Sequence, residues 1–227
     1  MGELPPSTHL SFAQQGEDLI VENILGWFKI FNPTYLDIGA NDPVRDSNTY
    51  LFYRKGARGV LVEPNPVFCD KLRRERPGDG VLQAGIGGAT PTEADYYVIR
   101  GAAANNTFSK EQADYLTRQY GPGTVEKVIK VPLVPINAVI ADNFDGVPNF
   151  LSIDTEGMDL TILQSLDFRR YRPHVVCVET LVPETGVPDE TILSLMRSKD
   201  YSIRGATFVN TIFLANELLE RVPTPLK

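Results

Sequence analysis

Cysteine, histidine and tryptophan are scarce in this sequence, which has two, two and one of them among 227 residues. Cys69 and Cys177 lie in apolar segments at no metal-ligand spacing, so we expect buried thiols in a reducing compartment, the cytoplasm. Two cysteines also exclude a small domain held together by several disulfides. No apolar run approaches the roughly 18 residues that span a bilayer. Residues 1–8 lack the basic and apolar regions of a signal peptide, so we expect neither such a peptide nor a transmembrane segment.

Positive charge is in deficit, because 22 lysines and arginines stand against 29 acidic residues and the net charge is −7. Proteins that bind nucleic acids usually present a basic face, and no stretch of this chain predicts one, so we expect no nucleic-acid partner. The small basic cluster of Arg73, Arg74 and Arg76 is interpreted as a solvated helix face. The acidity by itself predicts a well-hydrated surface and identifies no partner.

Apolar runs typical of β-strands alternate with helical patterns along the chain. The pattern predicts a parallel sheet with helices on both faces, built as one domain over residues 1–227. Residues 1–33 are interpreted as a helical N-terminal extension and residues 101–127 as a lid over the substrate. A closing antiparallel hairpin is expected at 201–204 and 208–214, joined by Gly205 and Ala206. The other predicted strands are 35–39, 59–63, 81–84, 96–99, 150–154 and 175–179, with a further strand pair around 128–134.

Four of the predicted strands end on an acidic residue or have one close to their end: Asp37, Glu63, Asp154 and Glu179. In open α/β sheets the ligand crevice lies beyond the carboxyl ends of the strands, where these side chains converge. A single acid at such a position is commonly a helix cap or a turn former. Four of them at one edge predict a binding site, because crowded carboxylates need hydrogen-bond donors or cations.

The turn after the first strand lacks the glycines of a dinucleotide-binding loop. That fingerprint needs three glycines, whereas here Gly39 stands alone and Pro43 has no N–H to offer. Glu63 follows Asp37 by 63 − 37 = 26 positions, a suitable place to accept hydrogen bonds from ribose hydroxyls. The pocket therefore suits a nucleoside without a pyrophosphate. S-adenosylmethionine fits this description, and its positive charges suit an acidic crevice.

Five short segments extend this interpretation over most of the chain. They are residues 11–18 (SFAQQGED), 35–41 (YLDIGAN), 62–66 (VEPNP), 153–157 (IDTEG) and 210–213 (NTIF). In this order they resemble the motifs of the FkbM-type methyltransferases, a branch of the class I enzymes that use S-adenosylmethionine. The resemblance implies a Rossmann-like class I methyltransferase sheet. It also implies O-methylation, most often of a sugar hydroxyl on a glycan, a lipopolysaccharide or a glycosylated natural product.

One departure from the family pattern concerns the loop 42–49, which lacks the further glycine that the family often has. Ser47 is expected to open the next helix, either as its N-cap or with the helix N-terminus receiving the carboxylate of the cofactor. The residues expected to bind the cofactor are Asp37, Gly39, Ala40, Asn41, Ser47, Glu63, Pro64, Asn65, Gln15 and Asp154. The residues expected to contact the substrate are Asn105, Asn106, Glu156 and Asn210.

Methyl transfer to a hydroxyl requires alignment of the acceptor and removal of its proton. His9 lies near the N-terminus and His174 precedes a strand, so neither is expected at the crevice. Asp154 and Glu179 are the better candidates, as a general base or as ligands of a divalent cation such as Mg²⁺. Two alternatives stay open: an O-methyltransferase acting on a small molecule other than a sugar, and a non-catalytic binding protein with the same fold.

Overall fold

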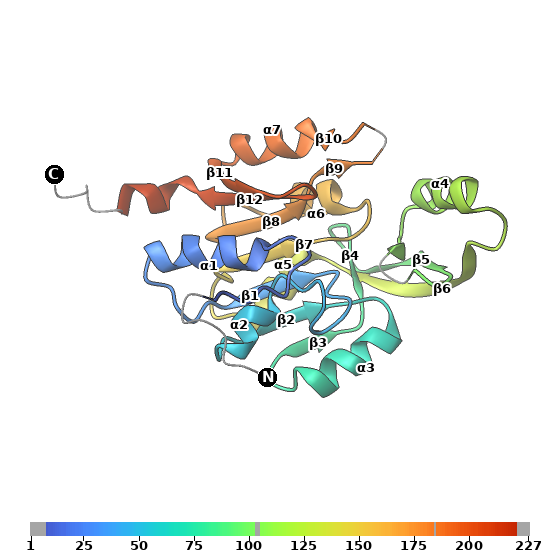
Figure 1. Ribbon diagram of the computed structural model, residues 1–227, viewed down its shortest axis with the longest axis horizontal. Coiled ribbons are helices and arrows are strands. Elements are labelled where there is room, and N and C mark those ends of the chain that lie inside the picture. Colours follow the sequence, from blue (N-terminus) through green and yellow to red (C-terminus); the bar gives the residue numbers. More distant parts are fainter. Residues whose placement is uncertain (1–7, 103–104, 184, 222–227) are drawn as a thin grey trace.

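The computed structural model describes residues 8–102, 105–183 and 185–221. Within them, seven strands form a central sheet in the order β11-β12-β8-β7-β1-β2-β3 (Figure 1). Neighbouring strands are parallel, except that β12 runs antiparallel to both β8 and β11. The predicted mainly parallel sheet with a closing hairpin is therefore confirmed. The strands are β1 (Tyr35–Ile38), β2 (Gly59–Val62), β3 (Gly80–Leu82), β7 (Phe150–Ile153), β8 (Val175–Glu179), β11 (Tyr201–Ala206) and β12 (Asn210–Ala215).

Helices cover both faces of this sheet, because alternate residues of each buried strand point to opposite sides. Leu36 and Ile38 face a core with α5 (Ile136–Asn143), α6 (Asp159–Ser165) and α7 (Glu190–Ser198). Tyr35 and Leu61 face the other core, with α1 (Glu17–Trp27), α2 (Tyr50–Arg54) and α3 (Pro66–Glu75). The N-terminal helix α1 thus packs directly on the sheet. Both cysteines are buried and form no disulfide, as the sequence predicts.

A second, smaller sheet projects from the side of the molecule together with α4 (Lys110–Tyr120) (Figure 1). Its strands β4 (Gly85–Ile86), β5 (Thr92–Ile99) and β6 (Val125–Val134) lie in the order β4-β6-β5. The predicted strand pair around 128–134 is wrong, because β6 runs without a break through this region and pairs antiparallel with β5. We call this part, residues 85–134, the lobe; it contains the predicted lid apart from positions 103–104, which lie outside the described residues.

The closing hairpin turns later than the sequence suggests. Gly205 lies within β11, opposite Ile212, at a shift in strand register. A Cβ at this glycine would lie 2.6 Å from Cγ2 of Ile20 on α1, so the glycine permits close packing and forms no turn. Two short strands, β9 (Leu181–Val182) and β10 (Val187–Pro188), and a 3₁₀ helix, η2 (Asn216–Arg221), complete the elements of the described residues. Among the described residues, no helix has the length and apolarity needed to cross a membrane.

Candidate active site

A cavity opens at the carboxyl edge of the central sheet, above β1, β2 and β7. We call it the first cavity. Of the predicted cofactor residues, Asn65 and Gln15 do not line it: the Asn65 side chain caps α3, and the Gln15 side chain accepts a hydrogen bond from the N–H of Phe208. Gln14, the residue before Gln15, lines the cavity instead. The predicted cofactor residues that line the first cavity are Asp37, Gly39, Ala40, Asn41, Ser47, Glu63, Pro64 and Asp154.

Gly39 allows the chain to turn tightly at the end of β1. Its φ is +86°, a conformation that costs little only for glycine. Its N–H donates to the carbonyl of Val62 on β2 at 2.9 Å. A Cβ on Gly39 would overlap the backbone carbonyl oxygen of Asp154 on the other side. The lone glycine thus lets the backbone turns after β1 and β7 approach each other at the cavity floor.

Glu63 links the loops that follow β1 and β2. Its carboxylate accepts hydrogen bonds from the N–H groups of Asn41 at 2.9 Å and Asn65 at 2.7 Å. The residue is 3% exposed. Burial raises the pKa of Glu63 to about 7, although the two N–H groups act in the opposite direction. An ionised carboxylate keeps free lone pairs after these two bonds, which suits it to the ribose hydroxyls of a nucleoside.

Lowering the pH from 8 to 5.5 should weaken binding of S-adenosylhomocysteine by roughly tenfold, because protonation of Glu63 below about 7 removes a hydrogen-bond acceptor. Isothermal titration at several pH values measures this. Glu63→Gln should bind weakly and lose the part of the pH dependence that comes from Glu63, while Glu156 of the same cavity, with a pKa of about 7, still titrates. Glu75→Gln, at an exposed position of α3, should behave as the wild type. Identical pH profiles for wild type and Glu63→Gln would rule out this role.

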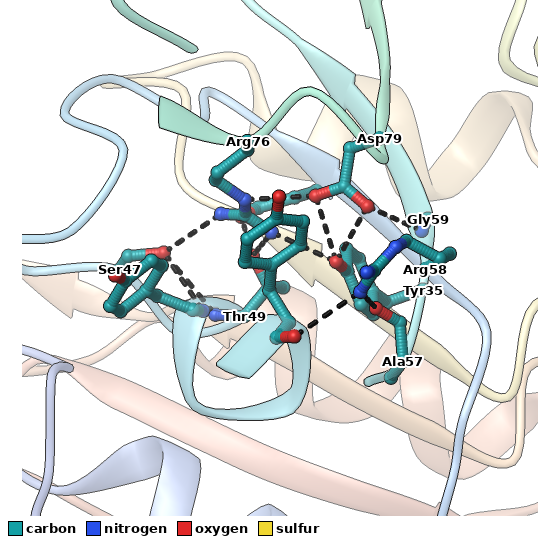
Figure 2. Close-up of polar contacts among 11 residues, drawn as sticks. Tyr35, Ser47, Thr49, Ala57, Arg58, Gly59, Arg76 and Asp79 are labelled. Carbon is teal, nitrogen blue, oxygen red and sulfur yellow. Dashed lines mark hydrogen bonds and ion pairs between the residues drawn. The ribbon is translucent and has the colours of Figure 1, made fainter. Parts of the chain in front are cut away.

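Arg76 is completely buried, so its predicted place on a solvated helix face is wrong. It follows the last residue of α3, and its side chain turns inward (Figure 2). Its Nε donates to Oδ2 of Asp79 at 2.8 Å, and one terminal nitrogen donates to the hydroxyls of Thr49 at 3.0 Å and Tyr35 at 3.1 Å. The other terminal nitrogen lies 3.4 Å from Oγ of Ser47.

This buried network reaches the first cavity through Thr49, which donates to Oδ2 of Asp37 at 2.5 Å. Burial raises the pKa of Asp37, while the Arg76 guanidinium and the Thr49 hydroxyl limit the rise. The Oγ of Ser47 accepts from the N–H of Tyr50, the first residue of α2, at 3.2 Å, but the N-cap of this short helix is Thr49, so the predicted N-cap at Ser47 is two residues too early. The network therefore fixes both Asp37 and the loop before α2, which together form one wall of the cavity.

Three carboxylates meet where β7 and β8 end: Asp154, Glu156 and Glu179, with oxygens within 4.8 Å of one another. Burial, together with the neighbouring carboxylates, raises the pKa of Asp154 well above its usual value. The same causes raise the pKa of Glu156 to about 7 and of Glu179 to about 9. Asp159, the first residue of α6, stabilises the turn after β7 by accepting a hydrogen bond from the N–H of Thr155 at 3.1 Å. We call Asp154, Glu156 and Glu179 the carboxylate trio.

A second cavity lies beside the first and shares Glu156 with it. Glu179 lines only this second cavity, together with Gln112 of α4 and residues around β9. Within the part of the chain that the structure describes, no lysine, arginine or histidine lines either cavity. The trio thus stands at the junction of two acidic cavities, the first between the carboxyl ends of β1, β2 and β7 and the lobe, and the second beside β9 and the start of α6. The predicted substrate residues Asn105, Asn106, Glu156 and Asn210 all line the first cavity.

Other residues of the first cavity were not predicted. Ser152 of β7 accepts a hydrogen bond from Nδ2 of Asn48 at 3.1 Å, and both side chains line the cavity. A polar residue within the otherwise apolar strand 150–153 is the sequence signal that could have revealed Ser152. Tyr96 and Phe108 come from the lobe, with ring centroids 4.7 Å apart. No motif marks them, because only the folding of the lobe brings them to the cavity. His174 lies before β8, at the opposite edge, and Asn149 contacts its ring.

Comparison with known proteins adds a family match. The model of the methyltransferase FkbM domain matches residues 37–203. A putative O-methyltransferase from Klebsiella pneumoniae is 9% identical, with 94% of this chain and 84% of that chain covered and a TM-score of 0.49. An O-methyltransferase from Bacillus cereus, solved in complex with SAH, is 13% identical, with 92% and 82% covered and a TM-score of 0.42. No curated protein matches the chain.

Proposed function

The chain belongs to the methyltransferase FkbM domain family, a family of S-adenosylmethionine-dependent enzymes, and we propose that it methylates a hydroxyl oxygen of a sugar. The acceptor would be part of a glycan, a lipopolysaccharide or a glycosylated natural product. The observation that carries this proposal is the carboxylate trio at the junction of the two cavities. An ionised carboxylate accepts hydrogen bonds and donates none. It therefore complements the adjacent hydroxyls of a sugar, which can all donate.

The first cavity fits the cofactor. Glu63 suits the ribose hydroxyls, and the turn at Gly39 leaves room for a ligand beside the backbone. The acidic lining complements the sulfonium and ammonium groups of S-adenosylmethionine. In addition, Oδ1 of Asn210 is buried in this wall without a hydrogen-bond partner among the described residues, as expected for a group that contacts a ligand.

In the proposed reaction the second cavity would hold the acceptor and the first cavity would hold S-adenosylmethionine, which would supply the methyl group for the acceptor hydroxyl. Asp154 lines the cofactor side and Glu179 the acceptor side of the junction. A raised pKa makes an ionised carboxylate a stronger base, and Glu179, with a pKa of about 9, gains this ionised form as the pH rises toward 9. We assign removal of the hydroxyl proton to Asp154 or Glu179, and orientation of the acceptor to Glu156.

The trio also offers the hard oxygen ligands that Mg²⁺ prefers. Asp154, Glu156 and Glu179 would hold such an ion, which would supply Lewis-acid polarisation of the acceptor hydroxyl. The general-base role and the cation-binding role of the carboxylates both predict that the same substitutions lower turnover. Only the cation-binding role predicts that removal of divalent cations also lowers it.

The proposal predicts that a panel of sugars and glycans will contain acceptors that yield S-adenosylhomocysteine and a methylated product. Asp154→Asn and Glu179→Gln should each lower turnover by roughly 10²–10⁴-fold, because the proton acceptor is lost. Glu179→Gln should keep its affinity for S-adenosylhomocysteine, since Glu179 does not line the first cavity. The matched control is Glu190→Gln, at an exposed position of α7.

Assays with EDTA and with added Mg²⁺ separate the two roles of the trio. Activity that survives EDTA unchanged would support the general base and exclude the cation. Methylation of non-sugar hydroxyls alone, with every sugar inert, would favour the alternative acceptor class. Unchanged turnover in both Asp154→Asn and Glu179→Gln would remove the carboxylates from the mechanism.

A further inference from the structure

The side-chain amide of Asn210 forms part of the wall of the first cavity. Asn210 begins β12, lies opposite Glu179 of β8 in the sheet register, and is 2% exposed. Its Nδ2 donates to Oε1 of Glu17 at 3.0 Å. Its Oδ1 has no hydrogen-bond partner among the described residues. Because buried polar atoms are normally paired, this oxygen is expected to meet a donor that belongs to a ligand.

Glu17 determines which end of this amide faces the cavity. Glu17 is fully buried at the start of α1 and accepts hydrogen bonds from the N–H of Gln15 at 2.8 Å and the hydroxyl of Thr207 at 2.7 Å. An ionised carboxylate can only accept, so a rotated Asn210 amide would place oxygen against oxygen. The Glu17 carboxylate thus keeps Nδ2 of Asn210 toward itself and Oδ1 toward the cavity.

The residues that line the first cavity together with Asn210 indicate which donor its oxygen would bind. Asp37 and Asp154 line the same cavity, and no basic side chain does so among the described residues. A cationic group with several N–H donors complements such a wall. The α-ammonium of the amino-acid tail of S-adenosylmethionine has this chemistry. A hydroxyl of the acceptor is less suited, because Asn210 does not line the second cavity with Glu179.

We propose that Oδ1 of Asn210, in the cavity wall that also contains Asp154, binds the α-ammonium of the cofactor, and that Glu17 is the positioning residue that orients this oxygen. The inference rests on the proposed use of S-adenosylmethionine in the first cavity. It assigns a function to the N-terminal segment 11–18, whose Glu17 and Gln15 both hold the β11–β12 turn.

The test compares two ligands that differ in the amino-acid tail. S-adenosylhomocysteine carries the ammonium, whereas 5′-methylthioadenosine keeps the nucleoside and the thioether and lacks the tail. Asn210→Leu should weaken binding of S-adenosylhomocysteine by roughly ten- to a hundredfold. Binding of 5′-methylthioadenosine should change less than about threefold, because this ligand has no ammonium for Asn210 to bind. Isothermal titration gives both affinities, and thermal melting checks that the variant is folded.

A reciprocal exchange tests the positioning role of Glu17. Glu17→Gln should weaken binding of S-adenosylhomocysteine more than binding of 5′-methylthioadenosine, because a glutamine amide can face Asn210 with either its oxygen or its nitrogen. Asn210→Asp should do the same by placing two carboxylates together. In the double variant, the amide introduced at position 17 can donate to the carboxylate introduced at position 210 and leave one of its oxygens toward the cavity. The double variant should therefore recover much of the affinity that each single variant loses.

Each outcome decides one claim. Equal weakening of both ligands by Asn210→Leu, or no effect on either, would overturn the assignment of the ammonium. A double variant no better than the worse single variant would overturn the positioning role of Glu17. Failure of the wild type to bind S-adenosylhomocysteine at all would instead refute the proposed function, so the two failures are distinguishable.

Discussion

Arg76→Met should lower the free energy of unfolding by about 3–5 kcal/mol, the usual cost of removing one partner of a buried ion pair. Arg76 and Asp79 have completely buried side chains and lie 2.8 Å apart. The substitution leaves the Asp79 carboxylate with Tyr35 and the N–H of Gly59 as its remaining donors. Urea unfolding followed by circular dichroism measures the loss.

The matched control is Arg73→Met in the last turn of α3, just before Arg76. Arg73 pairs with Asp70 at 3.2 Å, and its side chain is 47% exposed. Exposed pairs of this kind contribute about 0–1 kcal/mol, so the control should be nearly neutral. A loss below about 1 kcal/mol for Arg76→Met would show that the buried network is dispensable for stability.

Gly39→Ala should weaken binding of S-adenosylhomocysteine by about a hundredfold or more, because small displacements of binding groups have effects of this size. An alanine at this φ costs about 1–2 kcal/mol from backbone strain alone. Its Cβ would also overlap the carbonyl oxygen of Asp154, so the turns after β1 and β7 must separate. Both turns line the first cavity, and its shape changes with them. Titration with S-adenosylhomocysteine measures the loss of binding, and thermal melting measures the loss of stability from the backbone strain.

Gly26→Ala is the control for this substitution. Gly26 lies within α1, and a Cβ there would meet nothing within 4 Å. Alanine in such a helical position stabilises by about 0.4–1 kcal/mol. Unchanged ligand affinity in Gly39→Ala would show that the close approach to Asp154 is unimportant for binding.

The central sheet and most of the first cavity follow from local patterns in the sequence. Apolar strands alternate with helices, and the acids at the strand ends meet at one edge because parallel strands end together. Asp37, Glu63 and Asp154 were found in this way and line the first cavity. Glu179 follows the same rule but faces the second cavity, since β8 lies one strand farther from β1.

The residues that the sequence did not reveal depend on tertiary contacts. Arg76 stands in a charged run with Arg73 and Arg74, and nothing local distinguishes the one arginine that turns inward where the helix ends. Gly205 has the composition of a turn, but it lies within β11 because α1 packs against it. The lobe has little apolar periodicity, so Tyr96 and Phe108 could be placed only after β5 and β6 had paired.

The contact between Glu17 and Asn210 joins positions 193 residues apart in the sequence. During synthesis, the N-terminal segment and the first two strands leave the ribosome long before β12 exists. Until residue 210 emerges, Glu17 has no amide to orient and the wall of the first cavity is missing one of its members. A nascent chain can therefore assemble β1, β2 and the Glu63 link early. It acquires the complete pocket only when β12 enters the sheet between β8 and β11.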